Sequence, residues 1–403
     1  MTQHCGSDNV KAPLAEIDER IDRLLAGPAF PEHPERNRDE LLSVLRGELA
    51  YAEEREPRLR RYYEAWPVPY RSATRIADLP YLPAGVFKAS PTLSLVEPGR
   101  ITRTLTSSAT TGQTPSRVAL DAQTSKRMTR AIASILRSFI GPMRRPYLVI
   151  DTPDSLAGTD EIGARAAAIQ GLRTFATEIV CCLRSGPAGT LEIDEAGLLE
   201  FVARWRAAPV LAYGFTYVLW HHFVLPLKKK GICLDMPNLW LLHSGGWKRL
   251  QDQAVTRDEF ARGAASVFGC DALRILDFYG MVENVGIVYP DCDQGNKHVP
   301  AFAEIIVRDP LTLAPLPPGG QGLVQVCSVL PTSFPGHLVL TEDIGEVVGH
   351  DGCRCGRRGT SFRFVQRVPK AEIRGCGNVE RARGPDPHSS LTPDPSASGR
   401  GGR

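Results

Sequence analysis

Two segments near the start of the chain place apolar residues on one face of a helix. Over residues 11–26 leucine and isoleucine recur at helical spacing, and over residues 38–56 four leucines do the same. Proline and aromatic residues then dominate residues 66–91, and proline interrupts both helices and central strands. We therefore expect two amphipathic helices, followed by an irregular layer that lies across a surface.

The middle of the chain alternates short apolar runs with helical patterns. The predicted strands cover residues 101–108, 147–151, 174–183, 209–214, 237–246 and 273–281. The predicted helices cover residues 121–140, 161–172, 199–207 and 258–269. Strands and helices in alternation are typical of a doubly wound α/β domain. After Tyr289, short β-like runs between Pro and Gly turns predict a smaller β-rich layer.

These patterns divide the chain into three parts. We expect an N-terminal helical segment over residues 1–60, a main domain over residues 61–376 and a tail over residues 377–403. Twelve of the last twenty residues are Gly, Pro or Ser, and such a composition cannot pack a core. The pattern therefore predicts that the tail is disordered.

Composition and charge narrow the class of protein. Of the 403 residues, 42% are hydrophobic and 23% are charged, as in ordinary globular proteins. The net charge of +3 argues against a nucleic-acid partner, because dedicated nucleic-acid binders usually have a strong basic field. Residues 352–403 are basic, with eleven Lys or Arg and four Asp or Glu, which suits polyphosphate, an acidic partner or only solvent.

Signals for secretion or a membrane are absent from the sequence. The first thirteen residues lack the apolar core of a signal peptide. No uncharged apolar run approaches the roughly 18 residues of a membrane span. We therefore expect a cytoplasmic protein without a membrane span, whose ten cysteines are reduced.

A hydroxyl-rich stretch with the sequence LTSSATTG lies at the end of the strand predicted over residues 101–108. Hydroxyl groups and free backbone N–H groups can surround phosphate oxygens without a fixed charge. It is not a Walker loop, because the pattern G-x-x-x-x-G-K-[ST] occurs nowhere in the chain. A plain Ser/Thr turn is the alternative. The candidate phosphate contacts are Thr106, Ser107, Ser108, Thr110, Thr111 and Gly112.

Two further motifs lie at the ends of predicted strands. Tyr279 and Gly280 end one strand, where the tyrosine ring can stack on a base. Glu283 follows them and offers a carboxylate for Mg²⁺ beside a phosphate. Gly245 and Gly246 end another strand, and glycine lets a flat ligand approach the backbone closely. Taken singly, these motifs also fit a solvated glutamate and a plain turn.

Two charged residues complete the series. Asp343 in the run LTEDIG can accept both hydroxyls of a ribose, and Arg367 is a candidate cation for ribose or phosphate. Singly, each fits a solvated surface charge. The order of the motifs says more, because TSSxTTG, SGG, YGMxE, T-x-D and a late arginine follow one another as in acyl-adenylate-forming enzymes. The chain therefore resembles the superfamily of acyl-CoA ligases, luciferases and peptide-synthetase adenylation domains.

One branch of that superfamily is more similar. Over about residues 60–376, the segments LPYLPAGVFK, TSSATTGQTPS, HSGGWK, YGMVENVG and CRCGRRG…RVPKAEIRGC resemble the acyl-protein synthetase of the bacterial bioluminescence fatty-acid reductase. The resemblance implies the large N-terminal α/β domain of the superfamily. It also implies an enzyme that converts ATP and a carboxylic acid, here a fatty acid, to acyl-AMP and pyrophosphate. The acyl group then passes to an enzyme cysteine and onward to a partner reductase.

The resemblance assigns three catalytic residues. Glu283 would bind Mg²⁺, Arg367 would reach ribose or phosphate, and an acceptor cysteine would lie near the C-terminal end. Cys376 is the last cysteine and holds that position between Gly375 and Gly377. Its neighbours are cationic, which favours the reactive thiolate. The alternative is a tail residue without a function.

Three departures from the superfamily pattern keep other functions open. Ala109 stands where the phosphate loop usually has glycine, and no lysine follows the TTG triplet. After Gly375 no room remains for the usual lid domain with its catalytic lysine, for which Lys88 and Lys248 are candidate replacements. The first alternative is an acyl- or aryl-adenylating ligase that passes its product to CoA or a carrier protein. The second is a nucleotide- or partner-binding subunit without turnover.

A separate group of potential metal ligands lies in two turn-rich segments. Cys292 and His298 lie in YPDCDQGNKHVP, and Cys353 and Cys355 lie in GHDGCRCGRRG. Three thiols and an imidazole suit tetrahedral Zn²⁺, which would be structural because all four positions are filled. The spacing differs from a C-x-x-C finger, and the alternative is that Cys353 and Cys355 are unrelated loop thiols. The predicted cofactors are thus ATP, Mg²⁺ and, at this cluster, Zn²⁺.

Overall fold

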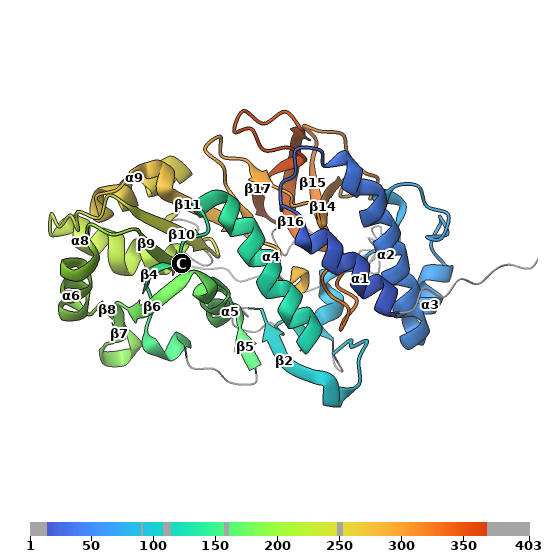
Figure 1. Cartoon of the computed structure of the whole chain (residues 1–403), viewed down its shortest axis with the longest axis horizontal. Helices are drawn as coiled ribbons and strands as arrows, with labels where there is room; N and C mark the ends of the chain where they lie inside the picture. The colour runs from blue at the N-terminus through green and yellow to red at the C-terminus, as the bar shows by residue number, and fades with distance from the viewer. Residues whose placement is uncertain (1–13, 90–91, 108–113, 157–160, 248–252, 369–403) are drawn as a thin grey trace, which may run out of the picture. The chain divides into compact units, whose positions relative to one another are not determined.

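The computed structural model describes residues 14–89, 92–107, 114–156, 161–247 and 253–368 (Figure 1). Up to Arg367 these residues belong to one packed unit. The tail predicted over residues 377–403 lies outside the described residues. Among the described helices, none combines the length and the apolar character that crossing a membrane requires.

Three helices begin the described part of the chain. They are α1 (Leu14–Ala26), α2 (Glu35–Arg55) and α3 (Pro57–Glu64). The first two confirm the helices predicted from the leucine spacing, whereas the sequence pattern does not indicate α3. Local contacts start α3, because Pro57 occupies its first turn and the Glu56 side chain accepts a hydrogen bond from the Arg58 N–H at 3.0 Å.

The central sheet has the strand order β12-β11-β10-β9-β4-β6, and only β12 in this sheet runs antiparallel to its neighbour. Its strands are β4 (Arg145–Val149), β6 (Ala176–Cys181), β9 (Val210–Phe215), β10 (Leu239–Ser244), β11 (Ile275–Tyr279) and β12 (Tyr289–Pro290). The helices of this part are α4 (Ala122–Ile140), α5 (Ala164–Gly171), α6 (Glu195–Trp205), α7 (Thr216–Leu219), a π-helical turn (Trp220–Val224), α8 (Leu225–Lys229) and α9 (Arg257–Phe268). Parallel strands joined by helices confirm the predicted α/β class.

An antiparallel sheet forms the β-rich layer predicted after Tyr289. Its order is β13-β17-β16-β15-β14, and β1 (Leu82–Pro83) pairs parallel with β16. Its antiparallel strands are β13 (Lys297–His298), β14 (Ala303–Arg308), β15 (Gln321–Ser328), β16 (Leu338–His350) and β17 (Thr360–Arg367). Fully and partly buried residues alternate along much of β16, as expected of a strand that packs one face on a core.

Smaller elements complete the described fold. A third sheet has the order β3-β2-β5, and β7 pairs with β8 as a hairpin. These strands are β2 (Ile101–Thr106), β3 (Arg117–Asp121), β5 (Glu161–Gly163), β7 (Leu183–Ser185) and β8 (Leu191–Ile193). The 3-10 turns are Ile76–Asp78, Ala84–Lys88, Pro98–Arg100, Pro153–Leu156, Leu172–Phe175, Pro187–Gly189, Ala272–Arg274 and Val282–Asn284. The helix predicted over residues 161–172 begins late, because its first three residues pair with β2 as a strand.

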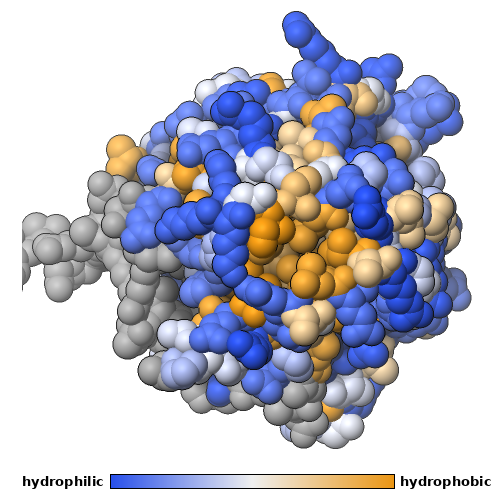
Figure 2. All heavy atoms as spheres, turned by 90° about the vertical axis from the view of Figure 1, so that its left-hand side faces the viewer, coloured by the Kyte–Doolittle hydropathy of each residue, from blue (hydrophilic) through white to orange (hydrophobic). Residues whose placement is uncertain are grey.

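One face of the α/β part exposes apolar side chains to solvent. Figure 2 shows an apolar area, surrounded by hydrophilic residues, on the side where α6 and α8 lie in Figure 1. Leu199 on α6 is 63% exposed, and Ile232, which follows α8, is 37% exposed. Exposed apolar residues of this kind are common on folded proteins, because there is too little polar surface to cover a core.

A buried arginine ties α1 to α4 and to the chain before β16. Arg127 on α4 is fully buried, and its Nη2 donates to the Asp18 Oδ1 on α1 at 2.6 Å. Its Nη1 donates to the Thr332 hydroxyl at 3.3 Å. Glu48 on α2 is also buried, and burial raises the pKa of its carboxyl well above the ordinary value, against the effect of Arg127. One guanidinium therefore links three parts of the chain that are distant in sequence.

Replacing Arg127 by methionine should lower the free energy of unfolding by about 2–4 kcal/mol, because Asp18 and Thr332 lose a buried partner. Urea unfolding followed by circular dichroism measures the loss. Arg130→Met is the matched control on the same helix, since the exposed pair of Arg130 with Asp22 should contribute less than about 1 kcal/mol. Equal losses in the two variants would contradict the role assigned to Arg127.

Candidate functional site

One hydrogen bond joins the two large sheets at the candidate nucleotide site. Tyr279 is the last residue of β11, and its hydroxyl donates to the Asp343 Oδ2 on β16 at 2.8 Å. Asp343 is buried, and its backbone N–H donates to the Thr341 hydroxyl at 3.1 Å. Burial and the Asp343 carboxylate raise the pKa of Tyr279 well above its ordinary value. The phenol therefore stays protonated and acts as a donor.

Two residues of β17 complete this contact. Asp343 and Arg367 are opposite one another in the ladder of β16 and β17, and the Arg367 Nε donates to the Asp343 Oδ1 at 3.1 Å. Phe364, which the sequence reasoning missed, stacks on the Tyr279 ring with the centroids 5.7 Å apart and the planes at 23°. Phe364 is 40% exposed. A solvent-accessible aromatic ring therefore covers one face of Tyr279.

A buried carboxylate and a lysine lie beside these residues. Glu283 is 5% exposed and lies in the 3-10 turn after β11. Burial raises the pKa of Glu283, while a hydrogen bond with Ser116 and the charges of Lys88 and Arg367 act to lower it. Lys88 also forms an ion pair with Glu342 at 3.1 Å. Lys88, a candidate lid replacement, thus contacts the sequence neighbour of Asp343.

The glycine pair after β10 adopts a conformation that favours glycine. Gly245 and Gly246 have φ angles of +88° and +59°, a region that residues with a Cβ rarely adopt. A Cβ on Gly245 would lie 2.5 Å from the ring of Phe215. Thr216 holds the chain just before this turn, because its hydroxyl donates to the Ser244 carbonyl at 3.0 Å.

Only the start of the hydroxyl-rich stretch, up to Ser107, lies within the described residues. Thr106 is the last residue of β2. The Ser107 N–H donates to the Ser116 carbonyl at 3.0 Å, and the Ser116 N–H donates to the Ser107 hydroxyl at 2.8 Å. Ser116 also lies within hydrogen-bonding reach of Glu283, so the start of the stretch is linked through Ser116 to the buried carboxylate. Outside the described residues lie Ser108, Thr110, Thr111, Gly112, Lys248 and Cys376.

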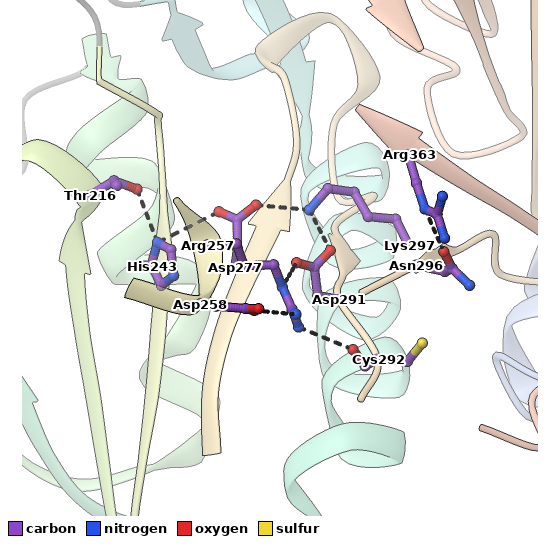
Figure 3. A network of polar contacts seen from close by, with 10 residues as sticks. All are labelled: Thr216, His243, Arg257, Asp258, Asp277, Asp291, Cys292, Asn296, Lys297 and Arg363. Carbon is purple, nitrogen blue, oxygen red and sulfur yellow. Dashed lines mark hydrogen bonds and ion pairs between the residues drawn. The ribbon is translucent and has the colours of Figure 1, made fainter. Parts of the chain in front are cut away.

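A partly buried ionic network, which the sequence reasoning also missed, connects β11 to the segment between β12 and β13 (Figure 3). Lys297 is buried, and its Nζ donates to the Asp277 Oδ2 and the Asp291 Oδ1, each at 2.9 Å. The Arg257 Nε donates to the Asp291 Oδ2 at 2.9 Å. Desolvation opposes the charges, but their attraction outweighs it, so the pKa of Lys297 is raised and that of Asp277 is lowered. Lys297 and Asp277 are therefore both ionised near pH 7.

His243 extends this network to the glycine loop. It precedes Ser244 on β10, and its Nδ1 lies 3.6 Å from the Asp277 Oδ1 and 3.0 Å from the Thr216 hydroxyl (Figure 3). Burial lowers the pKa of His243, against the effect of Asp277, so the ring is neutral near pH 7. Contacts thus run from the segment after β12 to the turn after β10.

The four predicted metal ligands come together in the fold. The ligand atoms of Cys292, His298, Cys353 and Cys355 lie within 4.8 Å of one another. The Cys292 Sγ is 3.8 Å from the Cys353 Sγ, and the Cys355 Sγ is 3.2 Å from the His298 Nε2. Burial raises the pKa of Cys292 to about 12 and lowers the pKa of His298 to about 4. Three sulfurs and a neutral imidazole are a donor set that suits Zn²⁺.

The fold is that of adenylate-forming ligases. A crystal structure of 2-hydroxyisobutyryl-CoA ligase in an open conformation, in complex with 2-HIB-AMP and CoA, matches with a TM-score of 0.61 at 17% identity. This match covers 82% of this chain and 74% of that chain. The same ligase in its thioesterification state matches with a TM-score of 0.60 at 18% identity, over 91% of this chain and 74% of that chain. At such identities the similarity shows a shared fold.

Within that class, the chain belongs to the family described as Acyl-protein synthetase, LuxE, which matches residues 58–382. A long-chain-fatty-acid–luciferin-component ligase of Vibrio harveyi is 34% identical over 140 residues, which cover 34% of this chain and 36% of that protein. A protein of the same name from Aliivibrio fischeri is 32% identical over 137 residues, which cover 34% and 35%. The matched stretch thus spans about a third of each relative. The family match confirms the resemblance inferred from the motifs.

Replacing Lys297 by methionine should lower the free energy of unfolding by about 3 kcal/mol, because Asp277 would lose its ammonium partner and Asp291 would keep only Arg257. Guanidinium unfolding measures the change. Lys230→Met serves as the control, since its exposed pair with Glu195 should contribute less than about 1 kcal/mol. If the Lys297 variant lost no more stability than this control, the network would not stabilise the contact between β11 and β13.

Proposed function

We propose that this chain uses ATP to activate a carboxylic acid, a long-chain fatty acid, as its acyl-AMP. Membership of the acyl-protein synthetase family supports this activity. The names of the two relatives, which state long-chain fatty acid ligation, support the choice of acid. The acyl group would then move to a cysteine of this chain and onward to a partner protein, either an acyl-accepting reductase or a carrier protein.

The observation that carries the proposal is the convergence of Tyr279, Asp343 and Arg367 from two sheets, beside Glu283. A carboxylate has about four acceptor positions, and Tyr279 and Arg367 each use one oxygen of Asp343. Positions therefore remain for the hydroxyls of a ribose. Tyr279, Gly280 and the glycine turn after β10 would frame the adenine, and Arg367 would reach the ribose or a phosphate.

In the first step, a carboxylate oxygen of the acid attacks the α-phosphorus of ATP, and pyrophosphate leaves with the bonding electron pair. Glu283 suits Mg²⁺, because it is a buried carboxylate without an ion pair to any described residue. Mg²⁺ neutralises charge on the departing pyrophosphate when it is bound. The stretch from Thr106 to Gly112 would hold the phosphates through hydroxyl and N–H groups.

Lys88 is the cation that we assign to the reacting phosphate. It ends the 3-10 turn Ala84–Lys88, where its ammonium contacts the partly exposed Glu342 and acts on the carboxyl of Glu283. A lysine ammonium is a point charge on a flexible stem, so it can move from Glu342 to a phosphate oxygen. There it would stabilise the charge that develops in the transition state.

In the second step, the thiolate sulfur of Cys376 attacks the acyl carbon, and AMP leaves as the thioester forms. A nucleophile of the partner protein then attacks the same carbon, and the Cys376 thiolate is released. This chemistry needs a reduced thiol, so we place the chain in the cytoplasm. We assign Zn²⁺ to the Cys/His cluster as a structural ion, because four protein ligands leave no open position for chemistry.

Acid-dependent exchange between ATP and pyrophosphate tests the proposal. Over a panel of short, long and aromatic acids, we expect the fastest exchange with long-chain fatty acids. Absence of exchange with every acid would refute the proposal and leave a nucleotide- or partner-binding subunit. Exchange without acyl labelling of the chain, together with formation of acyl-CoA or an acyl carrier, would favour the alternative ligase.

Lys88→Met should lower the kcat of pyrophosphate exchange about 10²-fold, the size expected when one group that stabilises developing charge is lost. Glu342→Gln is the matched control, because it breaks the same ion pair and keeps the ammonium. We expect that control to change kcat less than about threefold. Both are measured at saturating ATP and acid. Equal losses would show that the ion pair matters, and that the lysine charge does not act on a phosphate.

Cys376→Ser should keep acid-dependent exchange, since the mixed anhydride forms before the thiol acts. The variant should lose hydroxylamine-labile acyl labelling, because serine is a far poorer nucleophile than a thiolate near neutral pH. Labelled fatty acid followed by gel analysis measures this loss. Cys233→Ser, which changes an exposed thiol, should label like the wild type. Labelling that persists in the Cys376 variant would place the acceptor elsewhere.

A further inference from the structure

The Cys/His cluster lies where the chain crosses from one sheet to the other. β12 belongs to the central sheet through β11, and β13 belongs to the antiparallel sheet through β17. Only residues 291–296 separate β12 from β13, and Cys292 lies among them, while His298 ends β13. Cys353 and Cys355 lie in the loop between β16 and β17. The four side chains therefore bring this crossing into contact with a loop of the antiparallel sheet.

The spacing of the ligand atoms fits a tetrahedral ion. Zn–S bonds of about 2.3 Å place two sulfurs of a tetrahedron about 3.8 Å apart, and the Cys292 and Cys353 sulfurs are 3.8 Å apart. Asn296, within the crossing, donates from its Nδ2 to the Cys353 Sγ at 3.6 Å. Its Oδ1 accepts from the Arg363 Nε on β17 at 2.9 Å (Figure 3). Hydrogen bonds thus already align the crossing with the β16–β17 hairpin around the ligands.

We infer that Zn²⁺ at this cluster fixes the crossing and so keeps the two halves of the nucleotide site in register. This role rests on the proposed adenylation. Tyr279 and the glycine turn belong to the central sheet, whereas Asp343 and Arg367 belong to the antiparallel sheet. A displacement of one sheet relative to the other would break the Tyr279–Asp343 hydrogen bond, on which the adenine and ribose positions both depend.

One route from the cluster reaches Tyr279 through the ionic network. Asp291 and Lys297 are each the sequence neighbour of a proposed zinc ligand. Both contact Asp277, because the Asp291 N–H donates to the Asp277 carbonyl at 2.8 Å and the Lys297 Nζ donates to its carboxylate. Asp277 lies on β11 and precedes Tyr279 by two residues. Fixing the crossing therefore fixes the strand end that carries the tyrosine.

A second route reaches the same ring through β17. Phe362 pairs with Lys297 across β13 and β17. Its ring contacts Tyr279 and Tyr289 edge-on, with centroid distances of 6.1 Å and 5.1 Å. The zinc ligands of the β16–β17 loop precede this strand, and Arg367 ends it. The ion would thus affect both partners of the Tyr279–Asp343 hydrogen bond, through one route in each sheet.

Four proteins test the inference: the wild type, Cys355→Ser, Cys355→His and Cys233→Ser. We expect about one zinc per chain by elemental analysis in the wild type and in Cys233→Ser, since that thiol is exposed and outside the cluster. Cys355→Ser should lose zinc and raise the KM for ATP in pyrophosphate exchange about tenfold, with a smaller change in kcat. Cys355→His should restore both values, because imidazole replaces thiolate as a zinc ligand.

Three results would overturn the inference. The first is wild-type protein, purified without chelator, that holds no zinc. The second is a disulfide between Cys292 and Cys353 in the native protein. The third is a Cys355→Ser enzyme that loses zinc and unfolds at a lower temperature, yet keeps the wild-type KM for ATP. That last result would leave the ion a purely structural role.

A second measurement applies if Cys355→Ser does not fold. Removing zinc from the wild type with a chelator should raise the KM for ATP, and added Zn²⁺ should restore it. An unchanged KM after zinc loss would overturn the inference. If zinc-loaded wild type shows no ATP–pyrophosphate exchange with any acid, the proposed function fails. Amide hydrogen exchange then tests the inference about zinc independently. Zinc removal should lower protection in both β11 and β17, and a loss confined to the loop before β17 would contradict it.

Discussion

The hydrogen bond from Tyr279 to Asp343 is the contact on which the proposed nucleotide site depends, because it joins a strand of the central sheet to a strand of the antiparallel one. Asp343 is buried and Tyr279 is half-buried, and a hydrogen bond to a charged acceptor contributes about 1.5–3 kcal/mol. Arg367 shares the same carboxylate. Two side chains, one on β11 and one on β17, are therefore positioned by a single acceptor on β16, and such preorganisation is what electrostatic catalysis requires.

The charged residues around the Tyr279–Asp343 hydrogen bond fall into two groups. Lys297 is paired with two aspartates at 2.9 Å, so that group is satisfied and stabilises the strands. Glu283 is buried, its pKa is raised by burial, and it has no ion pair to a described residue, while Lys88 is paired with a glutamate that is partly exposed. Incompletely paired groups in a polar site are the ones that a metal ion or a phosphate can engage. The first group maintains the frame, and the second is available for chemistry.

Local patterns in the sequence were sufficient for the elements whose signal is local. Leucine spacing predicted α1 and α2, and the order of the motifs singled out Tyr279, Asp343 and Arg367, which are linked by hydrogen bonds in the fold. The strand character of β5 and β17 depends on pairing with β2 and β16, which sequence periodicity does not report. The sequence pattern did not indicate Phe364 or Lys297 for the same reason, because their roles depend on which strands are neighbours in the fold. Cys292 and Cys353 were recognisable as candidate zinc ligands across 61 positions only because few residue types bind zinc.

A calorimetric titration with a fatty-acyl sulfamoyl-adenosine, a non-hydrolysable mimic of acyl-AMP, tests most directly whether both sheets build one acyl-adenylate site. The mimic presents adenine, ribose and the acyl phosphate position together, so it engages both halves of the site at once. We predict one binding site per chain and an affinity at least about 10²-fold higher than that of AMP. Binding no tighter than AMP, or no binding, would contradict a site that holds the acyl adenylate across the two sheets.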